Sequence, residues 1–336
     1  MKFGLLSRKK QPAEAPPSAH NAPPEHATTT STTMAEPSSS KGPLPKSILH
    51  VDYDINNLPP VPPNYTRFVC ISDTHSHTFP VPPGDVLLHG GDLTNTGTVS
   101  NFEKTMEWLY EMPHKVKVII AGNHDLTLHE GWYDTAWSRW HSREGKQNIE
   151  PIKEMLKGSK AQKAGVIYLE DEETTFQAKE GGKTWSVYGS PWSPWFYDWA
   201  FNYLREDGEK MVSKIPKADI LLTHGPPHGI LDATNSGEFV GCEDLRKRLP
   251  TLRPRIHVFG HIHEAHGAYT HAWKDDICPS YQNNDSVLPE PDTDPNVDTT
   301  VFVNPANWPM GKRRAEYRTR EFGGDGFRPI IVDLLD

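Results

Sequence analysis

The chain has 336 residues but only three cysteines, Cys70, Cys242 and Cys278, and no two of them are spaced as CxxC. This pattern disfavours both a disulfide scaffold and a thiolate zinc site. No run approaches the roughly 18 apolar residues that a membrane span needs, which excludes an integral membrane protein. The apolar stretch near the start, Phe3 to Leu6, is too short for a secretory signal. We therefore expect a cytoplasmic protein, with a nuclear or mitochondrial location as the alternatives.

Positive charge is also scarce, because 35 lysines and arginines face 44 acidic residues and leave a formal net charge of -9. Such a surface repels nucleic acid overall, so no nucleic-acid partner and no membrane are expected. Proline (31) and glycine (25) are abundant, which is atypical of a helix bundle and indicates a loop-rich fold.

The composition divides the chain in two. Residues 1–64 are rich in proline, serine and threonine and bury too little apolar area to offset the entropy of ordering, so this leader is predicted to be disordered. Residues 65–336 are predicted to form one folded domain. Two stretches of it, near 131–165 and 274–300, are expected as surface insertions.

Short apolar runs recur through the second part. They span residues 67–72, 85–92, 115–125, 219–225 and 255–263, with later ones at 300–304 and 329–335. They lack clean alternation, as expected for strands buried on both faces. Helical patterns at Val99 to Tyr110, Ile149 to Leu156 and Cys242 to Leu249 lie between them. These features predict an α/β domain with central strands and helices packed outside.

Polar side chains follow five of these runs at the point where each ends. They are Asp73 and His75, Asp92, Asn123, His224, and finally His261 and His263. Each alone is an ordinary strand-end residue. In open α/β sheets, however, ligands bind beyond the carboxyl ends of the strands, so together these side chains are expected to converge on one crevice.

Imidazole and carboxylate ligands without a thiolate suit Mn, Fe, Zn or Co. Seven ligands are more than one such ion takes from protein while keeping an open position, whereas two ions bridged by a carboxylate use them all. Two-metal sites stabilise the attacking and leaving oxygens of an in-line displacement, so the pattern indicates hydrolysis at phosphorus.

The ordered blocks DTH, GD, GNHD, H and GHIH resemble the calcineurin-like metallophosphoesterase superfamily. The wider wording, including ISDTHSHT, LLHGGDLT, GSPWSPWF, LLTHGPPHGILD and FGHIHEAHG, is similar to the metallophosphoesterase-domain-containing branch, from about Tyr65 to the C-terminus. The resemblance implies a four-layer β-sandwich flanked by helices. It also implies two divalent ions (Mn²⁺, Fe²⁺/Fe³⁺ or Zn²⁺).

The resemblance assigns a role to each block. Asp73, His75 and His263 would hold the first metal, Asn123, His224 and His261 would hold the second, and Asp92 would bridge them. A hydroxide shared by the ions would attack phosphorus, because metal binding lowers the pKa of water. His124 would stand near the leaving oxygen and donate a proton.

One departure bears on the substrate. Protein Ser/Thr phosphatases of this superfamily carry an aspartate three residues after the bridging one, followed by Arg-Gly, whereas this chain has Asn95 there and no arginine. The chain thus resembles the phosphodiesterase-type branches, and Asn95 is expected to orient His124. Asp125, where those phosphatases carry glutamate, is either part of the site or a helix N-cap.

Substrate contacts are less well indicated. His77 and His228 sit close to ligand blocks, and Trp192 belongs to an aromatic block from Trp185 to Trp199; each is a candidate, although solvent exposure or packing is favoured for all three. The leading hypothesis is a metal-dependent phosphoesterase acting on a small molecule or nucleotide. The alternatives are a nucleotide-binding scaffold with little turnover, a protein phosphatase and a nuclease.

Overall fold

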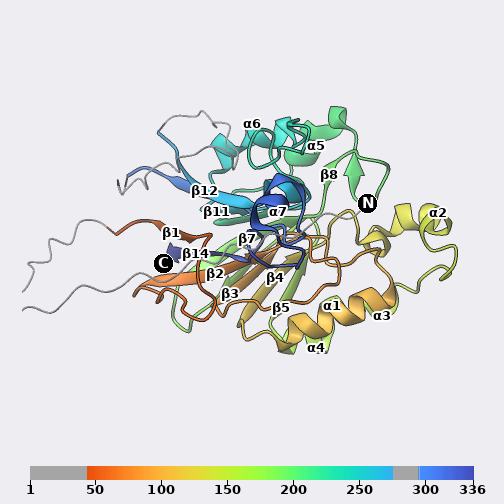
Figure 1. Cartoon of the computed structure of the whole chain (residues 1–336), viewed down its shortest axis with the longest axis horizontal. Helices are drawn as coiled ribbons and strands as arrows, with labels where there is room; N and C mark the ends of the chain where they lie inside the picture. The colour runs from red at the N-terminus through yellow and green to blue at the C-terminus, as the bar shows by residue number, and fades with distance from the viewer. Residues whose placement is uncertain (1–43, 275–293, 295) are drawn as a thin grey trace, which may run out of the picture. The chain divides into compact units, whose positions relative to one another are not determined.

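The computed structural model describes residues 44–274, 294 and 296–336 (Figure 1). The first of two six-stranded sheets has the order β1 (Ser47–His50), β14 (Ile330–Leu335), β2 (Tyr65–Ile71), β3 (Val86–His89), β4 (Val116–Ile120) and β5 (Val166–Leu169). Strands β2 to β5 run parallel, and β14 and β1 add antiparallel edges.

The second sheet also has six strands, with an antiparallel strand at each edge. Its order is β12 (Gly267–Ala272), β13 (Thr299–Asn304), β11 (Ile256–Val258), β10 (Ile220–Thr223), β7 (Thr184–Ser190) and β6 (Glu172–Gln177). The four central strands are parallel, and both edge strands are antiparallel. A separate short pair joins β8 (Ser193–Pro194) to β9 (Asn202–Tyr203).

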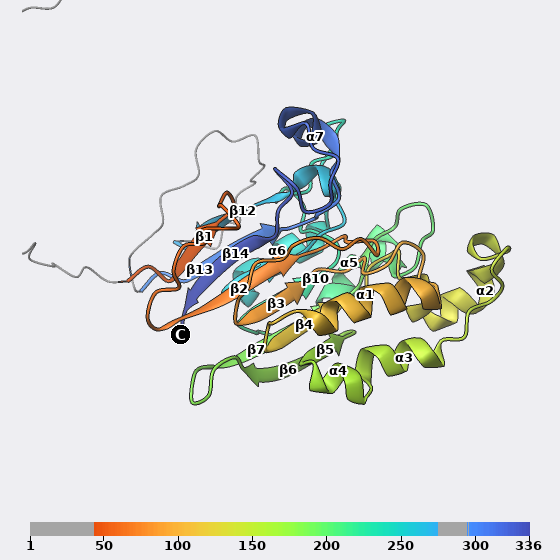
Figure 2. The same ribbon diagram turned by 60° about the horizontal axis from the view of Figure 1, so that its bottom comes forward.

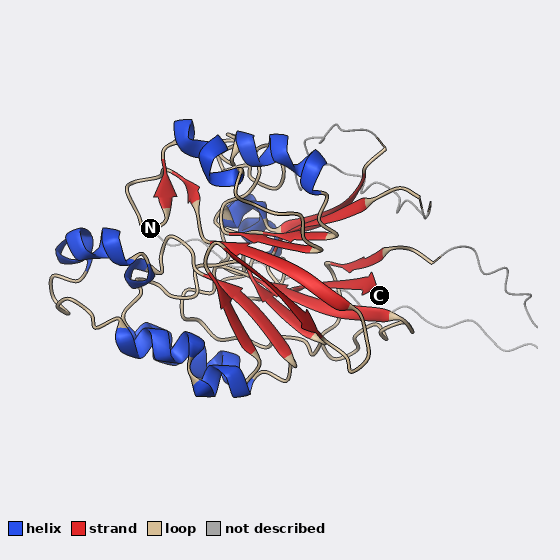
Figure 3. Cartoon of the chain, turned by 180° about the vertical axis from the view of Figure 1, so that it is seen from behind, coloured by secondary structure: helices blue, strands red, loops and turns tan. Residues whose placement is uncertain are grey.

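Helices cover the outer faces of both sheets (Figures 2 and 3). Beside the first sheet lie α1 (Val99–Glu111), α2 (Glu130–Trp140), α3 (Glu150–Lys157) and α4 (Ser159–Lys163), with the 3-10 turn η1 (Leu126–Leu128). On the second sheet lie α5 (Gly208–Val212) and α6 (Glu243–Leu252), with η2 (Arg205–Asp207). The short α7 (Gly311–Tyr317) packs against η3 (His263–Ala265).

Alternation along the strands builds the layers. In β2, Phe68 and Cys70 belong to the core between the two sheets, whereas Val69 and Ile71 belong to the core beneath α1. In the second sheet, Leu221 of β10 faces the core beneath α6. Successive side chains of a strand point to opposite faces, so strands with both faces covered read as continuous apolar runs. The prediction of a four-layer α/β fold is confirmed.

The prediction that disorder extends to residue 64 is wrong for the described part of the leader. β1 pairs with β14, whose outer edge would otherwise leave backbone groups unpaired. The buried Tyr53 hydroxyl then donates to the carbonyl of Pro329 at 2.7 Å. The proline-, serine- and threonine-rich composition is interrupted at β1, whose sequence SILH can pair with a sheet edge. Residues 1–43 lie outside the described part of the chain.

The expected surface insertions also need correction. The stretch 131–165 carries most of α2 and all of α3 and α4, and its residues Tyr133, Ile152, Leu156 and Ala161 are buried in the core of the first sheet. It is therefore part of the helical layer, because its apolar residues follow helical spacing. Of the second stretch, residues 275–293 and 295 lie outside the described residues, and Thr299 and Thr300 begin β13. Among the residues described, no helix combines the length and apolarity that crossing a membrane requires.

Candidate metal centre

The carboxyl ends of the parallel strands of both sheets meet at one edge. An isolated parallel bridge joins Ser72, just after β2, to Ala306, just after β13. Between the β10 and β11 ends, the amide of Gly260 donates to the carbonyl of His224 at 3.0 Å. Loops from the two sheets are thereby fixed against each other, and the polar residues that follow the strands lie close together.

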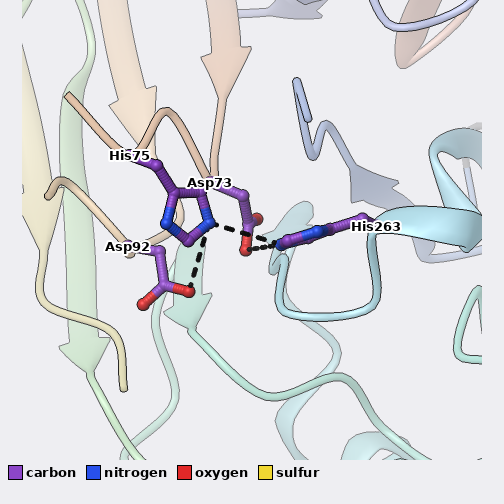
Figure 4. A group of neighbouring side chains, drawn as sticks. All are labelled: Asp73, His75, Asp92 and His263. Atoms are coloured by element: carbon purple, nitrogen blue, oxygen red, sulfur yellow. Dashed lines mark hydrogen bonds and ion pairs between the residues drawn. The ribbon is translucent and has the colours of Figure 1, made fainter. Parts of the chain in front are cut away.

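The first group of predicted ligands forms a tight cluster of Asp73, His75, Asp92 and His263 (Figure 4), whose ligand atoms all lie within 4.8 Å of one another. Nε2 of His263 is 3.1 Å from Oδ1 of Asp73 and 3.4 Å from Nε2 of His75. Nε2 of His75 is 3.7 Å from Oδ2 of Asp92. Loops after β2, β3 and β11 supply these four side chains.

The second group adjoins the first through Asp92. Nε2 of His224 lies 2.9 Å from Oδ1 of Asn123 and 3.4 Å from Oδ1 of Asp92. Nδ1 of His224 is 2.9 Å from the carbonyl of Gly90, which can only accept, so Nδ1 is the donor and Nε2 faces the crevice. The ring of His261 lies edge-on to that of His224, with their centroids 5.1 Å apart. The structure thus brings all seven predicted residues together.

The backbone at this crevice is strained. Positive φ angles between 45° and 68° occur at Asp73, His75, Asp92 and His261. This backbone conformation is energetically unfavourable for every residue except glycine. Such outliers persist where the surrounding structure fixes them and cluster at functional sites. Gly260 lies against the same site, because a Cβ on it would stand 2.1 Å from Oδ2 of Asp73.

Burial sets the charge state of the imidazoles. It holds the pKa of His75 well below its usual range and lowers that of His261 to about 3, so both rings are neutral. Burial opposes protonation of His224 too, but the Asp92 carboxylate outweighs it and raises the pKa of His224 to about 9.

These donors fit divalent metal ions. Atoms bound to one ion at about 2.0–2.2 Å lie roughly 3 Å apart, which is close to the spacing of the His75 and His263 nitrogens. Two buried carboxylates, a side-chain amide and imidazole Nε2 atoms, with no thiolate, suit Mn, Fe or Zn. Asp73, His75 and His263 could hold one ion, Asn123, His224 and His261 a second, and Asp92 faces both groups.

His124 stands at the rim, with its Nδ1 2.8 Å from the backbone carbonyl of Asn95. The prediction that the Asn95 side chain orients His124 is therefore wrong: Asn95 is exposed, and its main-chain carbonyl makes the contact. Asp125 is buried and accepts from the amides of Leu93, Thr94 and Gly122. It ties the β4 loop to the β3 loop and makes no N-cap bond to η1.

The three weaker candidates lie in different surroundings. His77 is exposed and stacks on Phe322, with ring centroids 3.6 Å apart. His228 lies edge-on to Phe239 in the loop after β10. Trp192 lies edge-on to Phe201, with ring centroids 5.6 Å apart, and donates from Nε1 to Asp171 at 2.8 Å.

Two tryptophans, Trp308 and Trp199, also lie at the site, although the sequence does not predict them as site residues. Trp308 lies edge-on to His75 at 4.5 Å and stacks on His263 at 5.5 Å. Trp199 stacks on His124 at 4.1 Å. Trp308 follows the end of β13, so the strand-end rule could have found it, but Trp199 belongs to a long loop and gives no such signal.

Comparisons with known proteins agree with this geometry. A profile of calcineurin-like phosphoesterases matches residues 66–265. Metallophosphoesterase domain-containing protein 1 of Homo sapiens, like that of Mus musculus, is 42% identical over 222 residues, covering 62% of this chain and 64% of the relative. UPF0046 protein T07D4.2 of Caenorhabditis elegans is 36% identical over 234 residues, covering 63% of this chain and 54% of that protein.

The matched region thus spans less than two thirds of each relative, but the profile covers more than half of this chain and includes every predicted metal ligand. The resemblance drawn from the sequence blocks is confirmed, and the chain belongs to the calcineurin-like phosphoesterase family.

Proposed function

We propose that the chain is a dinuclear metal-dependent phosphoesterase that hydrolyses a phosphodiester or phosphomonoester of a small molecule or nucleotide. One observation carries the proposal: the Asp92 carboxylate lies between the two groups of candidate ligands. Its Oδ2 is 3.7 Å from Nε2 of His75, and its Oδ1 is 3.4 Å from Nε2 of His224. A buried carboxylate shared by two ligand sets is what a two-ion site needs.

When bound, two divalent ions activate water and neutralise charge on the phosphoryl oxygens. The chain contributes the positions of the ligands. The Asp125 carboxylate holds the loops after β3 and β4 together, and the Nδ1–H of His224 bonds to the Gly90 carbonyl and aims Nε2 inward. Such outer contacts orient ligands and sustain metal affinity.

His124 is the group that would serve the leaving oxygen. Its Nδ1 donates to the carbonyl of Asn95, so Nε2 is the ring nitrogen left for a substrate. The edge of the His75 ring stands against it, with centroids 4.5 Å apart, which places His124 beside the first ligand group. A proton delivered to the departing oxygen typically accelerates a reaction about 10²–10⁴-fold.

The first experiment combines metal analysis with a substrate panel. The protein is loaded with Mn²⁺, Fe²⁺ or Zn²⁺, its metal content is measured by mass spectrometry, and it is assayed on bis-p-nitrophenyl phosphate, p-nitrophenyl phosphate and cyclic AMP. We expect two ions per chain and turnover of at least one ester. Tight nucleotide binding with negligible hydrolysis of the whole panel would instead favour the nucleotide-binding scaffold.

A further inference from the structure

The His124 ring has a second support besides its hydrogen bond. The ring of Trp199 stacks on it, with centroids 4.1 Å apart and planes 28° from parallel. A single bond at Nδ1 leaves the imidazole free to swing about that bond. A flat indole on one face removes this freedom, so Trp199 limits where Nε2 can point.

Trp199 is itself supported by residues of α2. The ring of Trp140, the last residue of α2, packs on it at 3.9 Å. The guanidinium of Arg139 binds the carboxylate of the neighbouring Asp198 at 2.9 Å. The amide of Trp199 donates to Oδ1 of Asn202 at 3.2 Å. The loop before β9 is thus fixed to α2 at Trp199 and at Asp198.

The other side of His124 depends on the same helix. The residue after Asn95 is Thr96, whose carbonyl lies 3.0 Å from Nε2 of His141, the C-cap of α2. A carbonyl only accepts, so Nε2 of His141 donates, and its Nδ1 accepts from the buried hydroxyl of Tyr133 at 2.6 Å. Two of the contacts of His124, the Asn95 carbonyl and the Trp199 face, are therefore braced by α2.

We propose that Trp199, supported by Trp140 of α2, is a positioning residue that aims Nε2 of His124 at the leaving oxygen of the substrate. The proposal rests on the proposed phosphoesterase function, and it assigns to α2 a role in the reaction. Loss of the indole face would misdirect the proton donor while leaving the metal ligands in place. The consequence is specific: poor leaving groups, which need a proton, suffer more than good ones.

The kinetic test compares the phenyl and p-nitrophenyl esters of thymidine 5′-phosphate, since phenol, with a pKa of about 10, requires protonation far more than p-nitrophenol does. For Trp199→Ala we expect kcat to fall about 10-fold or more with the phenyl ester, less than about threefold with the p-nitrophenyl ester, and KM to be unchanged. Trp199→Phe, which keeps a flat ring, should restore most of the phenyl-ester rate. Tyr197→Ala removes an aromatic ring of the same loop that is 72% exposed and should match the parent protein.

A second readout needs no turnover. In metal-free protein with ¹³C-labelled histidine, the Hε1 signal of His124 is assigned as the one missing from His124→Gln. Ring-current shielding by the indole should disappear in Trp199→Ala, so that this signal moves downfield, whereas Tyr197→Ala should leave it in place. Retention of the His124 shift in Trp199→Ala, or an equal loss of kcat for both esters, would overturn the inference alone. A parent protein that binds metal but hydrolyses neither these two esters nor any ester of the substrate panel would overturn the proposed function and this inference with it.

Discussion

The backbone amide of His124 donates a hydrogen bond to Oδ1 of Asp92 at 2.8 Å. The proposed proton donor and the carboxylate between the two ligand groups are therefore parts of one structure. His224 also approaches this oxygen, at 3.4 Å, so changes at Asp92 reach both the candidate metal ligands and His124.

Asp92→Asn tests the shared carboxylate. The substitution keeps the shape of the side chain and removes the charge that faces His75 and His224. We expect the metal content to fall below two ions per chain. We also expect the phosphoesterase rate to drop at least about 100-fold, because mutating even the residues that hydrogen-bond to metal ligands typically lowers metal affinity or activity about 10–100-fold. Metal content is read by mass spectrometry and the rate with bis-p-nitrophenyl phosphate.

Asp134→Asn is the matched control for the loss of one carboxylate. Asp134 lies on α2 with a side chain 62% exposed and pairs with Lys146 at 2.8 Å. Exposed pairs of this kind contribute about 0–1 kcal/mol, so metal content and rate should be those of the parent protein. Full metal content and full activity in Asp92→Asn would remove the basis for a shared carboxylate.

His124→Gln separates proton donation from metal binding. The glutamine side chain keeps polar atoms at the rim but cannot deliver a proton, and the amide bond to Asp92 comes from the backbone and stays available. We expect unchanged metal content and a fall in kcat of about 10²–10⁴-fold with unactivated esters. A variant with an unchanged rate on such an ester would show that the leaving oxygen obtains its proton elsewhere.

Gly260→Ala tests the close approach of the Gly260 backbone to the Asp73 carboxylate. A Cβ at this position would lie 2.1 Å from both Oδ2 of Asp73 and Oγ of Ser72, far inside contact distance. Asp73 is fully buried and has little room to yield, so the methyl group should displace its carboxylate. We expect metal affinity to weaken at least about 10-fold, as measured by titration with Mn²⁺.

Gly131→Ala gives the same chemical change where there is space. Gly131 lies in α2, and a Cβ there would have no neighbouring atom within 4 Å. Alanine is the better helix former by about 1 kcal/mol, so stability should hold or rise and metal affinity should not change. If both variants weakened metal binding equally, a steric effect at Asp73 would not be the cause.

The strand-end rule accounts for how much of the site could be predicted. Asp73, Asp92 and His224 each follow a buried parallel strand, and the carboxyl ends of such strands meet at one edge. Local residues therefore determine where these side chains emerge. The layers were predictable for the same reason, because continuous apolar runs indicate strands covered on both faces.

Contacts that depend on distant segments could not be predicted in this way. Asn95 meets His124 through its carbonyl, and a main-chain contact leaves no trace in residue type. Trp199 packs on Trp140 of α2, and α2 lies in a stretch whose composition resembles an insertion. β1 similarly forms because β14 offers an open edge, which the leader sequence does not reveal.

The Arg67–Asp333 pair joins β2 to β14, and His50 of the leader also contacts Asp333, which gives a prediction for stability. Arg67 donates to both carboxylate oxygens of Asp333 at 2.7 Å, and Nε2 of His50 lies 3.0 Å from one of them. The Asp333 side chain is fully buried, and removing one partner of a buried pair typically costs about 3–5 kcal/mol. Asp333→Asn should therefore lower the free energy of unfolding in urea by about 3 kcal/mol at neutral pH. Asp325→Asn, which breaks the exposed pair with Arg328, should cost less than about 1 kcal/mol.

The pH dependence of that difference has a definite sign. Burial would raise the pKa of Asp333, but Arg67 and His50 outweigh it and hold the pKa below its usual range. A depressed folded-state pKa gives stability that is fully present above the unfolded value of about 3.9 and is lost as pH falls through the folded value. Asparagine does not titrate, so the gap between Asp333→Asn and the parent protein should narrow below about pH 4. A gap that stayed constant or widened on acidification would mean that the carboxylate is not held ionised by Arg67.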